Sequence, residues 1–419
     1  MPEGEFMYEE ACSQIEELIA DGEYLQAANL LQRVYLHRYR ELAPAREIRD
    51  EDLVFDFNPQ SPLLLRLKAA LFLHRIGDAL DREDFRRAYR YFDSLVAMPL
   101  PHELDPDLHF RLILQAEKLY RGADDVRLLE FIGAWGHGSL CAILAGCDAY
   151  PDRRGAARVV LSCLHAAVKR RVLQEGIEVD WLVPLGREVA FSTPVDVNTL
   201  RAYGRFLIAQ ERLNEALPIY QYLYPHFRET FHFWADLAYC FPGEPTVQIG
   251  LLFIALSRPA DEKYLGQTRK RLADLLYQEG YGEAAAEQIG HMLANRAKYQ
   301  YHISVHTRRK YERLAADFPA SEGSSLAIAE GFMREAEDVI RRGMEPEAWT
   351  VSRAPCRHTH GTMLEVEKDG GDALTFCCDG MPDLLGAVGG MVVSLYLARL
   401  GEGLPPSVVY GEHPRRGEG

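Results

Sequence analysis

Five residues near the C-terminal end carry the side chains best suited to chemistry: Cys356, His358, His360, Cys377 and Cys378. Thiolate and imidazole groups gathered at one place suit zinc, which prefers four such ligands in a tetrahedron. Their spacing, one C-x-H-x-H and one adjacent pair of cysteines, differs from that of a standard zinc finger. The alternative is that the two cysteines are a buried packing residue and its neighbour, while the histidines lie in a solvated loop.

A predicted β-hairpin is the element that would bring these residues together. Segments 362–367 and 373–377 have the composition of strands, and the sequence KDGG between them is typical of a hairpin turn. Pairing the strands about the centre of this turn places Met363 opposite Phe376 and leaves Cys378 close to the histidines. Adjacent strand residues point to opposite faces, so both cysteines can bind one metal only if the strand has already ended.

Two other groups of polar residues have spacings that argue against catalysis. His137, Ser139 and Cys141 lie so close in sequence that they need not face one another, and no oxyanion-donating turn accompanies them. His302 and His306 are one helical turn apart, but the segment HISVH lacks the glutamate that a metalloprotease requires. We therefore expect these residues to serve in packing or at the surface.

The elements that hold most of the chain together are predicted to be helices with a fixed period. The small residues Gly204, Ala238 and Ala273 recur 34 and 35 positions apart, each midway along a predicted first helix. Leu200 and Trp234 hold an equivalent bulky place 34 residues apart. Small residues recur where two helices must approach closely, and large ones fill the groove beside them.

This pattern resembles the tetratricopeptide repeat, which consists of helix–turn–helix units of about 34 residues. The resemblance covers about residues 7–318 and is degenerate in the middle. It implies helix pairs that stack because none can bury its apolar face alone, forming an extended concave wall. Proteins built in this way bind peptides or partner domains far more often than they catalyse reactions.

The tail carries a second resemblance. A cysteine, a hairpin, a cysteine-bearing turn and a segment containing Leu-Gly are similar to the iron–sulfur-binding tail of radical peptide-modifying enzymes. That resemblance implies an iron–sulfur site in the tail and repeats that deliver a peptide substrate. However, such domains usually carry more cysteines, and the C-x-x-x-C-x-x-C motif of radical chemistry is absent from the chain. Zinc, an iron–sulfur cluster and no cofactor all remain open.

We predict a mainly α fold, a solenoid of helix pairs followed by a small C-terminal α/β module. The predicted divisions are helical repeats at 1–125 and 197–345, a degenerate helical middle at 126–196, and the α/β module at 346–419. Glycines around 133–138 are expected to interrupt one helix of the middle. In the module, 384–400 is expected to be a helix, although three glycines weaken it, and 407–410 a last strand.

The register of the repeats also predicts a partner-binding surface. In such repeats the first helix of each pair lines the concave wall, and its free face would carry Asn198, Arg201, Arg205, His232, Tyr239, Gln267, Lys270 and Tyr277. Three fixed positive charges there would give this face the opposite sign to the chain's net charge of −15. We expect the wall at 198–278 to receive an acidic peptide or a terminal carboxylate. The alternative is ordinary solvated charges, paired with Glu211 or Asp236.

Composition limits the function further. With 47% hydrophobic and 26% charged residues, the chain is typical of a folded protein, and its acidity argues against nonspecific binding to nucleic acid or anionic lipid. No apolar run is long enough to span a bilayer, and the first residues do not resemble a signal peptide. Eight cysteines are too sparse for a disulfide scaffold, so we expect a cytoplasmic location. The two hypotheses are a helical-repeat adaptor for a protein or peptide, and an enzyme or enzyme accessory acting through its Cys/His tail.

Overall fold

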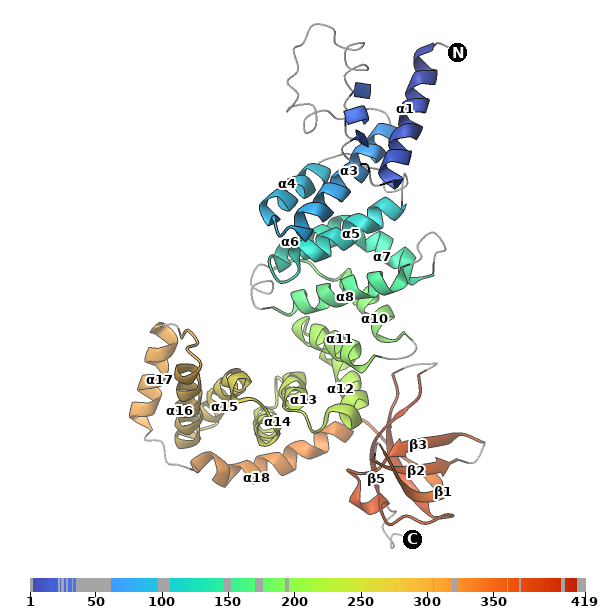
Figure 1. Cartoon of the computed structure of the whole chain (residues 1–419). Coiled ribbons are helices and arrows are strands. Elements are labelled where there is room, and N and C mark those ends of the chain that lie inside the picture. Colours follow the sequence, from blue (N-terminus) through green and yellow to red (C-terminus); the bar gives the residue numbers. More distant parts are fainter. Residues whose placement is uncertain are drawn as a thin grey trace. The chain divides into compact units, whose positions relative to one another are not determined.

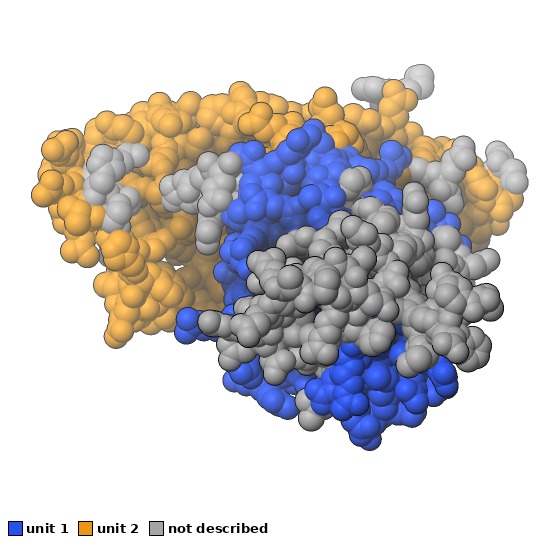
Figure 2. Space-filling model, turned by 90° about the horizontal axis from the view of Figure 1, so that it is seen from above, with its two compact units in different colours: residues 1–189 blue, residues 190–419 orange. Residues whose placement is uncertain are grey.

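The chain is mainly helical and ends in a small antiparallel sheet (Figure 1). The computed structural model describes residues 3–412 except 22, 24, 25, 28, 32, 35–61, 97–105, 147–151, 170–175, 193–195, 304, 319–322, 360, 369–370 and 401–403. The chain forms two compact units, residues 1–189 and 190–419, which are coloured separately in Figure 2. Within the described residues, no helix is long and apolar enough to cross a membrane.

Unit 1 consists of helices whose apolar faces meet in an aromatic core. Phe92 packs edge-on against Tyr120 and Phe131, with ring centroids 5.3 and 5.0 Å apart. The described helices are α1 (Glu3–Ala20), α3 (Pro62–Asp81), α4 (Phe85–Val96), α5 (Pro106–Tyr120), α6 (Asp125–Phe131), the π-helix η1 (Ile132–Gly136), α7 (His137–Leu144), α8 (Arg153–Ala167) and α10 (Leu182–Ala190), whose last residue belongs to unit 2. The predicted glycine interruption is thus a π-helical turn between α6 and α7.

Unit 2 begins with helices that pack in consecutive pairs. The pairs are α11 with α12, α13 with α14, and α15 with α16. The helical elements are α11 (Val197–Ala209), α12 (Leu213–Phe227), α13 (Phe231–Leu237), η2 (Ala238–Cys240), α14 (Pro245–Ser257), η3 (Glu262–Tyr264), α15 (Gly266–Gln278), α16 (Gly282–Lys298), α17 (Val305–Asp317), α18 (Ser324–Glu337) and η4 (Asp338–Arg341).

The positions that define the predicted period are all in the core. Leu200, Ala238 and Ala273 are fully buried, and Trp234 is 3% exposed. A Cβ atom on Gly204 would lie 3.2 Å from side-chain atoms of Ile219 and Tyr220, so this glycine does allow α11 and α12 to approach closely.

Helix α18 departs from a simple succession of pairs, because it packs back on α14 and α16. A Cβ on Gly250 of α14 would lie 2.2 Å from the carbonyl oxygen of Phe332, so the two helices meet backbone to backbone. The start of α18 is held by Glu287 of α16, whose carboxylate accepts hydrogen bonds from the backbone N–H groups of Gly323 (2.8 Å) and Ser325 (2.7 Å) and from the Ser324 hydroxyl (3.0 Å).

The C-terminal sheet has five antiparallel strands in the order β3-β2-β1-β4-β5. Its core face is formed by alternating residues such as Trp349, Val351, Leu364 and Val366. The elements are β1 (Pro346–His358), β2 (Gly361–Glu367), β3 (Ala373–Cys377), the 3-10 turn η5 (Pro382–Leu384), β4 (Val392–Ala398) and β5 (Ser407–Glu412). The predicted strands 362–367, 373–377 and 407–410 are confirmed.

The predicted helix at 384–400 is wrong. After η5 the chain turns through Gly390, whose φ is +81°, and then forms strand β4. Every second residue of that strand is buried (Val393, Leu395 and Leu397), which is the strand period of two rather than the helical period of 3.6. Within the described residues the module is therefore a β-sheet with one 3-10 turn, not α/β.

The sheet belongs to the same unit as α11–α18 and packs on α12 through β4 and β5. The Arg341 guanidinium lies over the rings of Tyr396 (5.5 Å) and Tyr410 (4.5 Å). The next residue, Arg342, pairs with Glu244, and its carbonyl oxygen accepts a hydrogen bond from Gln221 (2.8 Å). These contacts fix the entry to β1.

Candidate functional site

The two predicted arginines of α11 share one carboxylate on the neighbouring first helix. Arg201 donates two hydrogen bonds to Asp236 of α13, at 3.1 Å from Nε and 2.6 Å from Nη2. The Nε atom of Arg205 lies 3.6 Å from the other oxygen of Asp236. Arg201 and Asp236 are only 23% and 17% exposed, so this pair is partly shielded from water. The pairing with Asp236 is the alternative that the sequence left open.

A third arginine, Arg271 of α15, was not predicted. Its guanidinium lies 3.4 Å from the centre of the Tyr239 ring. Its Nη2 donates to Gln248 Oε1 (2.7 Å) and to the Ala238 carbonyl oxygen (3.2 Å), while its Nη1 is buried without a hydrogen-bond partner. Burial lowers the pKa of Arg271. A signal existed, since Arg201, Asp236 and Arg271 are spaced by 35 residues, close to the spacing predicted from Gly204, Ala238 and Ala273.

The remaining predicted contact residues are spread along α11, α13 and α15. Lys270 lies 3.5 Å from Asp274 on its own helix, and Tyr277 packs edge-on against Phe318. His232 lies beside the Tyr264 ring, and burial lowers its pKa. Asn198 and Gln267 are exposed. We call Arg201, Arg205, Asp236, Lys270 and Arg271 the basic row.

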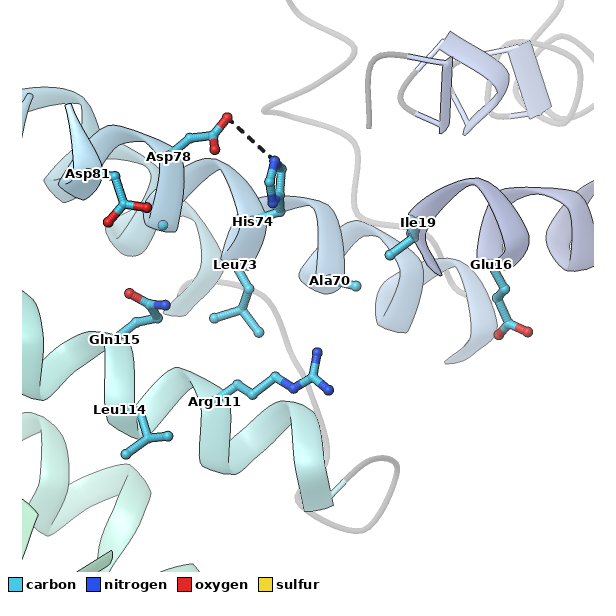
Figure 3. A pocket seen from close by; sticks show the side chains of 11 residues that line it. Glu16, Ile19, Ala70, Leu73, His74, Asp78, Asp81, Arg111, Leu114 and Gln115 are labelled. Atoms are coloured by element: carbon cyan, nitrogen blue, oxygen red, sulfur yellow. Dashed lines mark ion pairs between the residues drawn. The ribbon is translucent and has the colours of Figure 1, made fainter. Parts of the chain in front are cut away.

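A second candidate surface lies in unit 1, where sequence reasoning placed no site. A pocket of about 670 Å³ lies between α1, α3 and α5 (Figure 3). The sequence predicts these helices to be the first of their pairs. Its floor is apolar, formed by Ile19, Ala70, Leu73 and Leu114.

The edge of this pocket carries hydrogen-bond acceptors. Figure 3 shows Asp78, Asp81 and Gln115 at one end, with Glu16 and Arg111 toward the other. Asp78 lies 3.4 Å from His74, and Asp81 accepts a 2.8 Å hydrogen bond from Lys118. The side-chain oxygen of Gln115 is buried and has no hydrogen-bond partner. The pocket therefore combines an apolar floor with the carboxylates of Asp78 and Asp81, which can accept further hydrogen bonds.

In the tail, the hairpin register differs by one residue from the prediction. Met363 pairs with Cys377, and Leu364, rather than Met363, pairs with Phe376. The reason is the length of the loop: the Lys368 N–H donates to the Asp372 carbonyl oxygen, so three residues rather than two separate the last bonded pair. The register of a hairpin is set by its loop length, so one additional loop residue shifts every cross-strand pair by one position.

The predicted metal ligands lie on different strands. Cys356 of β1 and Cys377 of β3 pair with Met363 from its two sides, so a whole strand separates them, and both are exposed. Cys378 is buried, its thiol lies 3.3 Å from the Thr362 carbonyl oxygen, and burial raises its pKa.

His358 is exposed and pairs with Gly361, whereas His360 lies outside the described residues. Among the residues that the structure describes, no three His, Cys, Asp or Glu side chains are close enough to hold a metal ion.

The two groups judged unsuited to catalysis lie in α7 and at the start of α17. Ser139 is buried in α7, and burial raises the pKa of the Cys141 thiol on the same helix. His302 is exposed just before α17. The side chains of His137 and His306 lie outside the described part of the chain.

Comparison with known proteins bears on the helical part of unit 2. A family profile described as "Domain of unknown function (DUF7017)" matches residues 202–313, from α11 into α17. That match includes Asp236 and Arg271 and ends before the sheet. No match was found among curated proteins.

Proposed function

We propose that the chain is a helical-repeat scaffold, similar to tetratricopeptide-repeat proteins, that binds a partner through the exposed faces of its first helices. The observation that carries this proposal is the recurrence of contacts between alternate helical elements at nearly constant sequence separation. Arg201 and Asp236 are 35 residues apart, and Arg271 and Ala238 are 33 apart. In unit 1, Lys118 and Asp81 are 37 apart. A regular separation is what stacking of similar helix pairs requires.

The basic row gives the scaffold a charge preference. Arg201, Arg205, Lys270 and Arg271 supply four positive charges, whereas Asp236 and Asp274 supply two negative ones. The local excess of two positive charges contrasts with the chain's net charge of −15. Such a row attracts anionic segments within the Debye length, which is about 8–10 Å at physiological ionic strength.

We therefore propose an acidic peptide segment, or a chain's terminal carboxylate, as the partner at 198–278. Arg205 is the arginine best placed to receive it, because it is exposed and shares Asp236 with Arg201. Arginine can bind a carboxylate through two parallel hydrogen bonds. Exposed Tyr239 and Tyr277 would add apolar contact area.

The seven described cysteines are free thiols, which supports a reducing, cytoplasmic setting.

The test uses the full chain and two fluorescein-labelled ten-residue peptides, one rich in Glu and one rich in Lys, read by fluorescence anisotropy at low and high salt. The wild-type chain should bind the Glu peptide, and the triple variant Arg201→Ala, Arg205→Ala, Lys270→Ala should lose at least tenfold in affinity. A matched triple, Arg308→Ala, Arg309→Ala, Arg334→Ala, removes the same charge from exposed positions on α17 and α18 and should change affinity less than twofold. Equal losses in both triples would contradict the assignment of this surface.

A further inference from the structure

We propose that the pocket between α1, α3 and α5 is a second binding site, for a peptide segment that presents an apolar side chain beside a lysine or arginine. The proposal rests on the scaffold role above but uses a different surface with the opposite charge preference. The pocket (Figure 3) is lined by residues of unit 1 alone.

The apolar half of the ligand follows from the floor. Ile19, Leu73 and Leu114 come from three different helices and line one hollow, with Ala70 between them. Its volume of about 670 Å³ is within the roughly 300–1,000 Å³ typical of ligand sites, which is room for more than one side chain. A leucine, methionine or phenylalanine placed there would remove apolar surface from water on both partners.

The cationic half follows from the acceptors at the edge. Asp78 is 48% exposed, and Asp81 is 73% exposed even though it accepts a hydrogen bond from Lys118. A carboxylate has four lone-pair positions, so both groups can accept further hydrogen bonds. Gln115 also lines the pocket, but its side-chain oxygen is buried, so the exposed carboxylates of Asp78 and Asp81 are the acceptors that a ligand would meet. A lysine ammonium or an arginine guanidinium carries only donors and matches this set.

Gly77 explains why the hollow exists and gives a way to fill it. It lies on α3 between the acidic end and the floor, and it lines the pocket. A Cβ atom built on it would meet a single neighbour within 4 Å, the Gln115 amide nitrogen at 3.8 Å. A leucine at this position would therefore grow into the pocket without displacing the backbone. Glycine in a helix is also unfavourable, so Gly77→Leu should not weaken α3.

The experiment measures binding of two labelled twelve-residue amphipathic peptides to the full chain by fluorescence anisotropy. Both peptides carry leucines at helical spacing, and they differ only in having Lys or Glu at the flanking positions. The wild-type chain should bind the Lys peptide at least tenfold more tightly than the Glu peptide. Gly77→Leu should weaken binding of the Lys peptide at least tenfold while its melting temperature stays at or above that of the wild type.

Charge is tested separately from shape. The double variant Asp78→Asn, Asp81→Asn should weaken binding of the Lys peptide about fivefold and reduce its salt dependence. The matched double Glu279→Gln, Glu283→Gln neutralises two exposed carboxylates in unit 2 and should have less than a twofold effect. A third variant, Gly331→Leu, places the same side chain on an open face of α18 and should also leave binding unchanged.

Three results would overturn the proposal: no binding of the Lys peptide, equal binding of both peptides, or full affinity in Gly77→Leu. Failure of the scaffold role can be told apart from failure of this site. The acidic peptide that tests the basic row should bind Gly77→Leu as it binds the wild type. If only the pocket proposal is wrong, that acidic binding persists.

Discussion

The basic row of unit 2 and the pocket of unit 1 both lie on helices that the sequence predicts to be the first of their pairs, but they differ in what their side chains do. In the basic row, charged groups on α11, α13 and α15 mainly contact one another, and Arg201, Asp236 and Arg271 are partly buried. In the pocket, the polar side chains stand around an apolar floor, and Gln115 has an acceptor with no partner. The comparison teaches that sequence spacing can indicate which helix faces are exposed. Packing then decides which charged side chains on those faces stay available to a partner.

The largest expected effect comes from removing a bulky core residue of α13, the helix that also carries Asp236 of the basic row. Trp234 is 3% exposed and donates from its indole N–H to the Arg228 carbonyl oxygen at 2.6 Å. Trp234→Ala should open a cavity and lower the free energy of unfolding by about 3–5 kcal/mol. Urea denaturation measures this change. Binding of the Lys peptide to unit 1 should survive in conditions where unit 2 has unfolded; loss of both together would show that the surfaces are not independent.

An effect of similar size is expected at the start of α18, and it depends on pH. Burial raises the pKa of Glu287, but hydrogen bonds from Ser325, Gly323 and Ser324 outweigh it and lower that pKa from 4.5 to about 2. A carboxyl with a lowered folded pKa stabilises the fold above its unfolded pKa, and this stabilisation disappears as pH falls from about 4.5 to 2. Since 1.36 kcal/mol corresponds to one pKa unit, the contribution at pH 7 is about 3 kcal/mol.

The variant Glu287→Gln tests this contribution. It should lower the free energy of unfolding of unit 2 at pH 7, and its difference from the wild type should shrink steadily as pH falls from about 4.5 to 2. Unit 1 contains no part of this site, so at pH 7 the variant should bind the Lys peptide as the wild type does. A difference that stayed constant down to pH 2 would contradict the assigned role of Glu287.

Two glycines give the most direct contrast between the surfaces. A leucine at Gly204 would press on Ile219 and Tyr220, which lie 3.2 Å from the position of its Cβ, and should cost about 1–3 kcal/mol. A leucine at Gly77 meets open space and should leave stability unchanged or raise it by up to about 1 kcal/mol. Thermal unfolding of the two variants measures the difference. Equal melting temperatures would mean that Gly204 does not mark a close helix contact.

The smallest effect is expected in the tail. Cys356 and Cys377 are exposed on strands separated by β2, so Cys356→Ser should shift the melting temperature by less than about 1 °C. Treatment with a chelator should have no larger effect. A molar equivalent of zinc or iron in the purified protein, together with destabilisation by the chelator, would instead support a metal site in the tail, because metal binding and folding are linked.

The helical character of most of the chain was predictable because it depends on local apolar patterns. Leu200 and Trp234 are bulky and Gly204 is small, as their places between helices require. Side-chain size can be read directly from the sequence. Arg271 was harder to predict, because its role depends on Tyr239 and Gln248 in other elements. The pocket was also hard to predict, because three helices must pack together before the space beside Gly77 is enclosed.

The sheet was predicted only where the pattern is local. The hairpin was evident from its turn, but its register depended on one loop residue. Strand β1 was missed, since it contains Pro355 and its pairing with β2 shifts register twice. Its extended form is imposed by β2 and β4 on its two sides. The segment 384–400 was apolar enough for a helix, and only the burial of alternate residues after Gly390 identifies it as a strand.

The return of α18 onto α14 has a consequence for how the chain is made. Gly250 and Phe332 meet in the folded protein but are 82 positions apart. At about 5–20 residues per second, a ribosome needs roughly 4–16 s to add that length of chain. During this time α14, buried almost throughout in the final fold, has lost water on only part of its surface. Helix α14 is therefore the segment that we expect chaperones to bind during synthesis, and fragments ending before α18 should aggregate.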